Sequence, residues 1–198
     1  MANSKRPYHH PDLRRALLDA AMVVVDREGH EKLSLRALAS TLGVSATAPQ
    51  AHFANKQALL TALAERGFRE LRERLERCAQ DGAPIDVFGA LADAYLAFAI
   101  ERRGRFRLMF GADVDLDGDE PLASAGDAAF NVLRSAVRRH GAGDASDEET
   151  ELKALMAWAT VHGLAHICVD RSISSRVKVD LDMLRKGRVV AELVVRSL

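Results

Sequence analysis

The stretch from Leu33 to Leu60 reads LSLRALASTLGVSATAPQAHFANKQALL. Its first half carries apolar side chains at helical spacing on one face, namely Leu35, Leu38, Ala39 and Leu42. Ser34 is placed to cap this helix, and Gly43 permits a sharp turn with positive φ. We expect Ser45 to cap a second helix over Ala46–Phe53, which would cross the first as in a helix-turn-helix.

A longer pattern surrounds this turn. It comprises Ala20-Ala21, Gly29, Ser34-Leu35-Arg36, Leu38-Ala39, Gly43-Val44-Ser45, His52-Phe53, Lys56 and Leu59-Leu60. From Leu17 to Leu63 the chain resembles the N-terminal domain of the TetR family of transcriptional repressors. Further along, Trp158, His162-Gly163 and the run FRLMFG at 106–111 resemble a C-terminal class within that family. This second resemblance implies a fold rather than a ligand.

The composition indicates a folded, all-α protein. The chain has 198 residues, 48% hydrophobic residues, five prolines and few aromatic residues. We expect about nine helices, near residues 12–28, 35–42, 46–53, 56–79, 85–102, 105–110, 124–139, 147–170 and 181–197. A three-helix helix-turn-helix domain over residues 8–56 would join a helical ligand-binding and dimerisation domain over residues 57–198.

Charge is distributed unevenly, although the formal net charge is zero. The N-terminal part is basic, through Lys5, Arg6, Arg14, Arg15, Arg36 and Lys56. Later segments are acidic, around residues 113–120 and 144–151. This asymmetry favours a DNA-facing end and a solvent-facing body. Residues 1–10 would form a terminal arm, either disordered or adding phosphate contacts through Lys5 and Arg6.

Nothing in the sequence indicates export or membrane insertion. Cys78 and Cys168 have neither metal nor redox spacing, and the N-terminus lacks an apolar signal segment. No apolar run approaches the length that spans a bilayer. The protein is therefore expected to be soluble and cytoplasmic.

The expected DNA-binding residues are Arg36, Ser45, Thr47, Gln50, His52 and Lys56. The resemblance implies phosphate contacts for His52 and Lys56 and a backbone or base contact for Arg36; the other interpretation of His52 is a packed side chain beside Phe53. Most family members carry a tyrosine where this chain has Gln50, whose amide suits adenine. With alanines filling much of the second helix, direct readout would be sparse and specificity modest.

The body carries large apolar groups that, given the resemblance, we expect to line an effector pocket. They are Tyr95, Phe98, Phe106, Met109, Phe110, Phe130 and Trp158, with His162 as a polar anchor. The other interpretation is that these residues form ordinary core.

Three charged clusters have a ligand interpretation and a structural one. His162, His166 and Asp170 lie four apart, a spacing able to hold a transition metal. Asp113, Asp115 and Asp117 have calcium-loop spacing, and Gly118 follows the third aspartate immediately, but no glutamate stands six residues after Gly118 to complete an EF-hand. Arg102, Arg103, Arg105 and Arg107 could bind an acid, with the following aspartate loop as the obvious internal partner. We expect no metal and no cofactor.

The leading interpretation is a homodimeric repressor, released from a palindromic operator by a small apolar ligand. The resemblance implies dimerisation through the last two helices, at 147–170 and 181–197. The alternative is a metal- or ligand-binding sensor with a vestigial DNA-binding domain. No nucleophile elbow, phosphate loop or Cys–His frame supports an enzyme.

Overall fold

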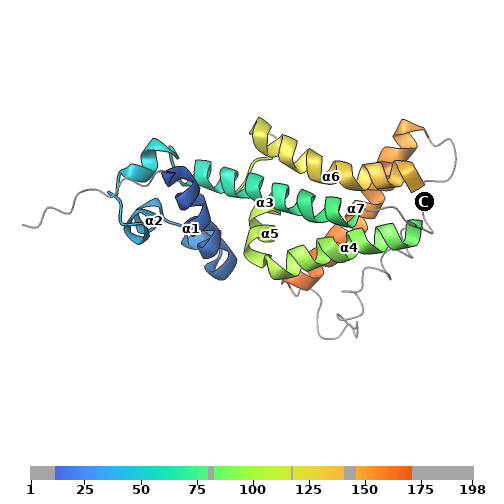
Figure 1. Cartoon of the computed structure of the whole chain (residues 1–198), viewed down its shortest axis with the longest axis horizontal. Coiled ribbons are helices and arrows are strands. Elements are labelled where there is room, and N and C mark those ends of the chain that lie inside the picture. The colour runs from blue at the N-terminus through green and yellow to red at the C-terminus, as the bar shows by residue number, and fades with distance from the viewer. Residues whose placement is uncertain (1–11, 80–82, 117, 141–145, 171–198) are drawn as a thin grey trace, which may run out of the picture. The chain divides into compact units, whose positions relative to one another are not determined.

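The computed structural model describes residues 12–79, 83–116, 118–140 and 146–170, and every regular element in these ranges is helical (Figure 1). The elements are α1 Leu13–Glu28, η1 His30–Lys32, α2 Leu35–Thr41, η2 Ala48–Ala51, α3 Lys56–Cys78, α4 Pro84–Glu101, α5 Arg103–Phe110, α6 Glu120–His140 and α7 Asp147–Asp170, where η denotes a 3₁₀ helix. The all-α prediction is confirmed. The arm at 1–10 and the helix expected at 181–197 lie outside the described residues.

The chain divides by contact into two compact units. The N-terminal unit is Met1–Gly67 with Gly104–Leu122, and the body is Phe68–Arg103 with Ala123–Leu198. Thus α5 and the loop after it group with the helix-turn-helix, although they follow it by some forty residues. The predicted functional boundary after residue 56 stays a prediction, because these units describe contacts and not functions.

Local signals start and stop the first helices where the sequence predicts. The Asp12 carboxylate accepts from the Arg15 amide at 3.0 Å, and the Ser34 hydroxyl accepts from the Ala37 amide at 3.4 Å. Gly29 and Gly43 follow α1 and α2 with φ of +89° and +67°, the left-handed region that glycine tolerates. The buried core of these elements with α3 includes Leu17, Ala21, Val25, Leu38, Phe53, Leu59, Leu60 and Leu63.

The second helix of the motif is shorter than predicted. An α-helix over Ala46–Phe53 is wrong, since the only regular structure there is the 3₁₀ helix Ala48–Ala51. Pro49 lies in its first turn, where the missing N–H is tolerated and does not by itself decide between a 3₁₀ turn and a longer α-helix. The prediction that Ser45 caps this helix is also wrong. Thr47 occupies the N-cap with no side-chain capping bond, and Ser45 Oγ lies 3.3 Å from Thr47 Oγ1.

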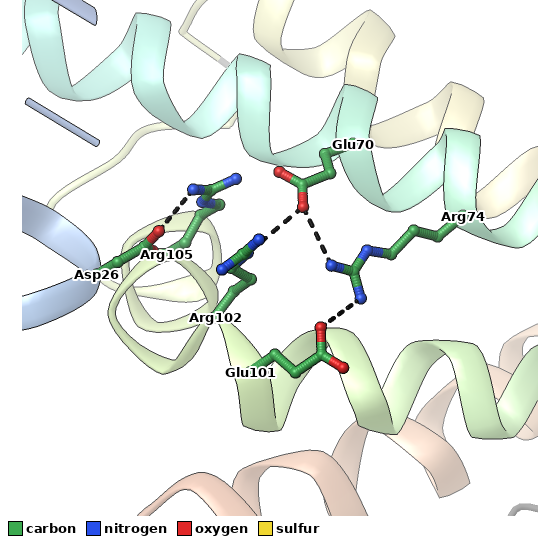
Figure 2. Close-up of polar contacts among 6 residues, drawn as sticks. All are labelled: Asp26, Glu70, Arg74, Glu101, Arg102 and Arg105. Carbon is green, nitrogen blue, oxygen red and sulfur yellow. Dashed lines mark hydrogen bonds and ion pairs between the residues drawn. The ribbon is translucent and has the colours of Figure 1, made fainter. Parts of the chain in front are cut away.

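Helix α5 packs tightly within the N-terminal unit. A Cβ at Gly104 would overlap the Val25 carbonyl oxygen of α1, so only glycine fits this backbone approach. Beside it, Arg105 Nη2 lies 2.6 Å from Asp26 Oδ2, and this pair is largely buried (Figure 2). At the other face, a Cβ at Gly67 would lie 2.5 Å from Met109 Sδ. Together these contacts fix α5 against α1 and α3.

The body is built on packing between α4 and α7. Its buried residues include Val87, Phe88, Leu91, Leu96, Phe98, Ala154, Ala157, Val161 and Ala165. Figure 2 shows a chain of ion pairs in which Glu70 contacts both Arg102 and Arg74, and Arg74 continues to Glu101. The pairs join α3 to the end of α4.

Helix α7 has one buried face and one exposed apolar face. Leu152, Leu155 and Met156 are 57%, 51% and 49% exposed. By length and composition alone, α7 is apolar enough to cross a membrane, contrary to the expectation that no such segment exists. The core helix of a soluble protein passes the same test, so one such helix is weak evidence for a membrane span.

Candidate DNA-binding and effector sites

The predicted DNA-binding side chains gather at the α2–α3 corner and are accessible. Arg36 on α2 and Ser45, Thr47, Gln50 and His52 around η2 are all exposed. Pro49 and Phe53 are buried beneath them and anchor the segment to the core. The corner therefore exposes hydroxyl, amide and imidazole groups, while the buried Pro49 and Phe53 anchor its backbone.

His52 is exposed, whereas its neighbour Phe53 is 3% exposed and has the Arg14 guanidinium 5.4 Å from its ring centroid. The structure thus separates the packing residue from the accessible one. A cavity of about 460 Å³ opens beside His52, lined by both charge signs, including Arg14, Glu65 and Asp119.

Lys56 is half-buried at the start of α3, and its Nζ donates to the Glu31 carbonyl oxygen at 3.0 Å. Sequence reasoning missed this contact, because Glu31 lies in η1, 25 residues earlier. An ammonium carries three N–H donors, so the bond leaves donors for a phosphate.

The predicted pocket residues fall in both contact units. Tyr95, Phe98, Phe130, Trp158 and His162 belong to the body, whereas Phe106, Met109 and Phe110 group by contact with the N-terminal unit. Phe106 and Phe110 lie 5.0 Å apart between ring centroids, and Phe106 and Met109 are fully buried. Phe98 is also fully buried, with Arg74 over its ring at 5.5 Å.

Tyr95, Trp158 and His162 form a contiguous aromatic cluster between α4 and α7. The His162 ring stacks on Trp158 at 4.4 Å and 15°, and the Tyr95 hydroxyl hydrogen-bonds His162 Nδ1 at 2.8 Å. Burial raises the pKa of Tyr95, although a hydrogen bond from Trp158 acts in the opposite direction. Burial, with His166 nearby, lowers the pKa of His162 to about 4. Both groups are therefore neutral at physiological pH.

The metal interpretations find no support among the described residues. His162 uses Nδ1 toward Tyr95, and His166 Nδ1 lies 3.1 Å from Asp170 Oδ2. No three His, Cys, Asp or Glu side chains in the described ranges are grouped to hold a metal. In the acidic loop, Asp117 lies outside the described residues.

Two members of the arginine run find acids that the sequence did not suggest. Arg102 Nε lies 3.5 Å from Glu70 on α3, and Arg105 pairs with Asp26 on α1. The sequence did not indicate these partners, because chain proximity does not predict which helices pack together.

Taken together, the helical architecture and the accessible polar corner define a helix-turn-helix DNA-binding protein. Residues 17–63 match the bacterial regulatory proteins of the tetR family, and residues 88–186 match the tetracyclin repressor-like C-terminal domain. The chain belongs to the TetR family of transcriptional regulators. It is accordingly a soluble DNA-binding regulator and not an enzyme.

Individual relatives agree with this assignment. An uncharacterised HTH-type transcriptional regulator of Mycobacterium tuberculosis is 27% identical over 76% of this chain and 67% of its own length. A solved protein of unknown function from Rhodococcus sp. RHA1 is 34% identical, covers 98% of this chain and 99% of its own, and superposes with a TM-score of 0.81. The regulator FadR of Bacillus subtilis, solved with stearoyl-CoA, shares the fold at 16% identity and a TM-score of 0.69, over 93% and 98% of the two chains.

Proposed function

We propose that this protein is a homodimeric, cytoplasmic repressor that binds a palindromic operator and is released from it by a small apolar effector. DNA binding follows from the family; the dimer, the operator symmetry and the effector are the proposal. The observation that carries it is the coexistence of an accessible polar corner in one unit with an uncovered apolar helix face in the other.

For DNA contact, we assign Arg36, His52 and Lys56 to phosphates or the groove edge, and Thr47 and Gln50 to bases, with Ser45 supporting Thr47. All of these residues except the half-buried Lys56 are exposed, which supports the assignment, since a side chain must be accessible to reach a duplex. Gln50 offers an amide that pairs with adenine through two hydrogen bonds. The single 3₁₀ turn presents few other donors, so specificity draws on DNA shape as well.

For dimerisation, we assign the face of α7 that carries Leu152, Leu155 and Met156. On this face, three large apolar side chains are about half exposed, which favours a protein–protein interface over a surface that faces water. Ala159 and Gly163 continue this face and are exposed too, and a Cβ at Gly163 would meet nothing within 4 Å. Small residues let a second helix approach closely. A second copy would cover the face, together with the segment 181–197.

For the effector, the aromatic cluster of Tyr95, Trp158 and His162 supplies an apolar surface with a neutral polar group at its centre. The predicted lining also includes Phe98, Phe106, Met109, Phe110 and Phe130. FadR, which shares this fold, was solved with stearoyl-CoA, a ligand with a long apolar chain. The functional domains would be residues 8–56 for DNA and 57–198 for effector and dimer.

The test is hydroxyl-radical footprinting on a duplex enriched by the protein from a random-sequence pool, together with the stoichiometry of the complex. We expect two protected patches on one face of the duplex about one helical turn apart, and two protein copies per duplex. Apolar compounds that stabilise the protein in a thermal-shift screen should then reduce protection. A single asymmetric patch with one bound copy would contradict the proposal.

A further inference from the structure

Asp113 bonds two separate segments of the helix-turn-helix from outside the motif. It lies in the loop between α5 and α6, and its Oδ2 is 2.8 Å from His30 Nε2 in η1. Its backbone carbonyl oxygen accepts from Gln57 Nε2, at the start of α3, at 2.6 Å. All three residues belong to the N-terminal unit.

The hydrogen bond to Asp113 satisfies a polar ring that is buried. His30 is 8% exposed, and a polar ring at that depth requires a hydrogen-bond partner. Asp113 is close enough to be that partner, whereas the carboxylate of Glu31 lies 3.8 Å away and is mostly exposed. Asp113 is itself held in place, because Val114 beside it is buried.

A second, shorter connection joins the same two segments, since Lys56 Nζ donates to the Glu31 carbonyl oxygen. The start of α3 is thus connected to η1 directly through Lys56 and indirectly through Gln57, Asp113 and His30. The recognition segment, residues 46–55, runs into α3 at this point. With one 3₁₀ turn as its only regular structure, it has little internal rigidity and depends on the supports at its ends.

We propose that Asp113 is a positioning residue for DNA binding. By joining η1 to the first turn of α3, it fixes where the recognition segment ends and so where Thr47, Gln50 and His52 stand. The loop after α5 thus contributes to DNA binding indirectly, by positioning the residues that contact the duplex. The inference rests on DNA binding by the family, and it stands or falls independently of the dimer and the effector.

The experiment compares Asp113→Ala with Asp115→Ala in the full-length protein, using fluorescence anisotropy on the duplex enriched by the wild-type protein. Both variants remove one negative charge from the same loop, which alone would strengthen DNA binding. Asp115 accepts a bond from the Gly118 amide within its own loop, so it controls for charge and loop context. We expect Asp113→Ala to bind about tenfold more weakly than Asp115→Ala.

Two further readouts separate positioning from general stability. Asp113→Asn keeps a side-chain acceptor for His30 and should recover most of the affinity. The double variant His30→Ala/Asp113→Ala should bind DNA no more weakly than the weaker-binding single variant, because both substitutions remove the same hydrogen bond. The slope of log affinity against log salt should change little in any variant, since Arg36 and Lys56, the cationic residues assigned to phosphates, are retained.

Equal affinities for Asp113→Ala and Asp115→Ala would overturn the proposal, as would a loss that tracks only the folded fraction measured by circular dichroism. If Asp113→Ala does not fold, Gln57→Ala decides, because Gln57 is exposed and its truncation leaves the core intact. We then expect binding about threefold weaker than wild type with an unchanged salt slope. Wild-type affinity in Gln57→Ala would refute the positioning role.

Discussion

Substituting Leu155 with glutamate should separate the proposed dimer without unfolding the protomer. Leu155 is 51% exposed on α7, so a partner can still cover about half of its side chain. Fully burying a leucine contributes about 1.5–3 kcal/mol, so the exposed half corresponds to about 1 kcal/mol in each protomer. Because both copies of the interface lose this term, the dimer should weaken by at least about 2 kcal/mol, or about thirtyfold in Kd.

The two introduced carboxylates increase this effect, because each would be moved out of water on association. The assay is sedimentation equilibrium over a concentration series, with circular dichroism to verify that helicity is retained. Val23→Glu is the matched control, since Val23 on α1 is 49% exposed and receives the same change in the N-terminal unit. An unchanged dimer Kd for a folded Leu155→Glu variant, or an equal loss for Val23→Glu, would refute the assignment of the interface to α7.

Three further predictions concern readout, packing and titration. Gln50→Ala should cost about 1–3 kcal/mol against the preferred duplex and relax preference at one A·T position, with an unchanged salt slope, in a competition binding assay. Gly104→Ala should destabilise the fold by at least about 2 kcal/mol in urea unfolding because its Cβ overlaps the Val25 carbonyl, whereas Gly43→Ala, where the space is open and only the left-handed φ is strained, should cost about 1 kcal/mol. The folded-state pKa of His162 lies below its ordinary value of 6.5, so the unfolded chain binds the proton more readily and stability should fall as pH drops from 6.5 toward 4; His162→Asn should lose less over that window in thermal unfolding, and an identical pH profile would contradict the assignment.

Local chemistry explains why the first helices could be predicted from sequence. Asp12 and Ser34 each bond an amide three residues on, and Gly43 adopts the positive φ expected at the turn. These signals act over one helical turn, so they can be recognised without knowing the fold. The family pattern then extends the prediction to the exposed corner.

The parts that sequence could not give depend on contacts between distant segments. His30 and Asp113 are 83 residues apart, and Arg105 and Asp26 are 79 residues apart. Nothing in the acidic run distinguishes Asp113 from its neighbours until α5 is packed against α1. The division of the expected pocket residues between two units is of the same kind, since helical spacing identifies an apolar face but not the helix that covers it.

The α-helix predicted over Ala46–Phe53 was wrong for a different reason, which concerns Pro49. Its effect on the backbone was recognisable, but a proline in a first turn is compatible with either a continuing α-helix or a single 3₁₀ turn. The structure has the shorter form, with both the His52 and Phe53 amides bonding the Pro49 carbonyl oxygen at 3.0 and 2.9 Å.

The most direct test of the central claim is the salt dependence of wild-type binding to its enriched duplex. If Arg36 and Lys56 each neutralise a phosphate in both protomers, the slope of log affinity against log salt should be about −3.6 or steeper. A slope near zero, with weak binding at every salt concentration, would mean that Arg36 and Lys56 do not contact phosphates, and it would contradict DNA binding through the α2–α3 corner.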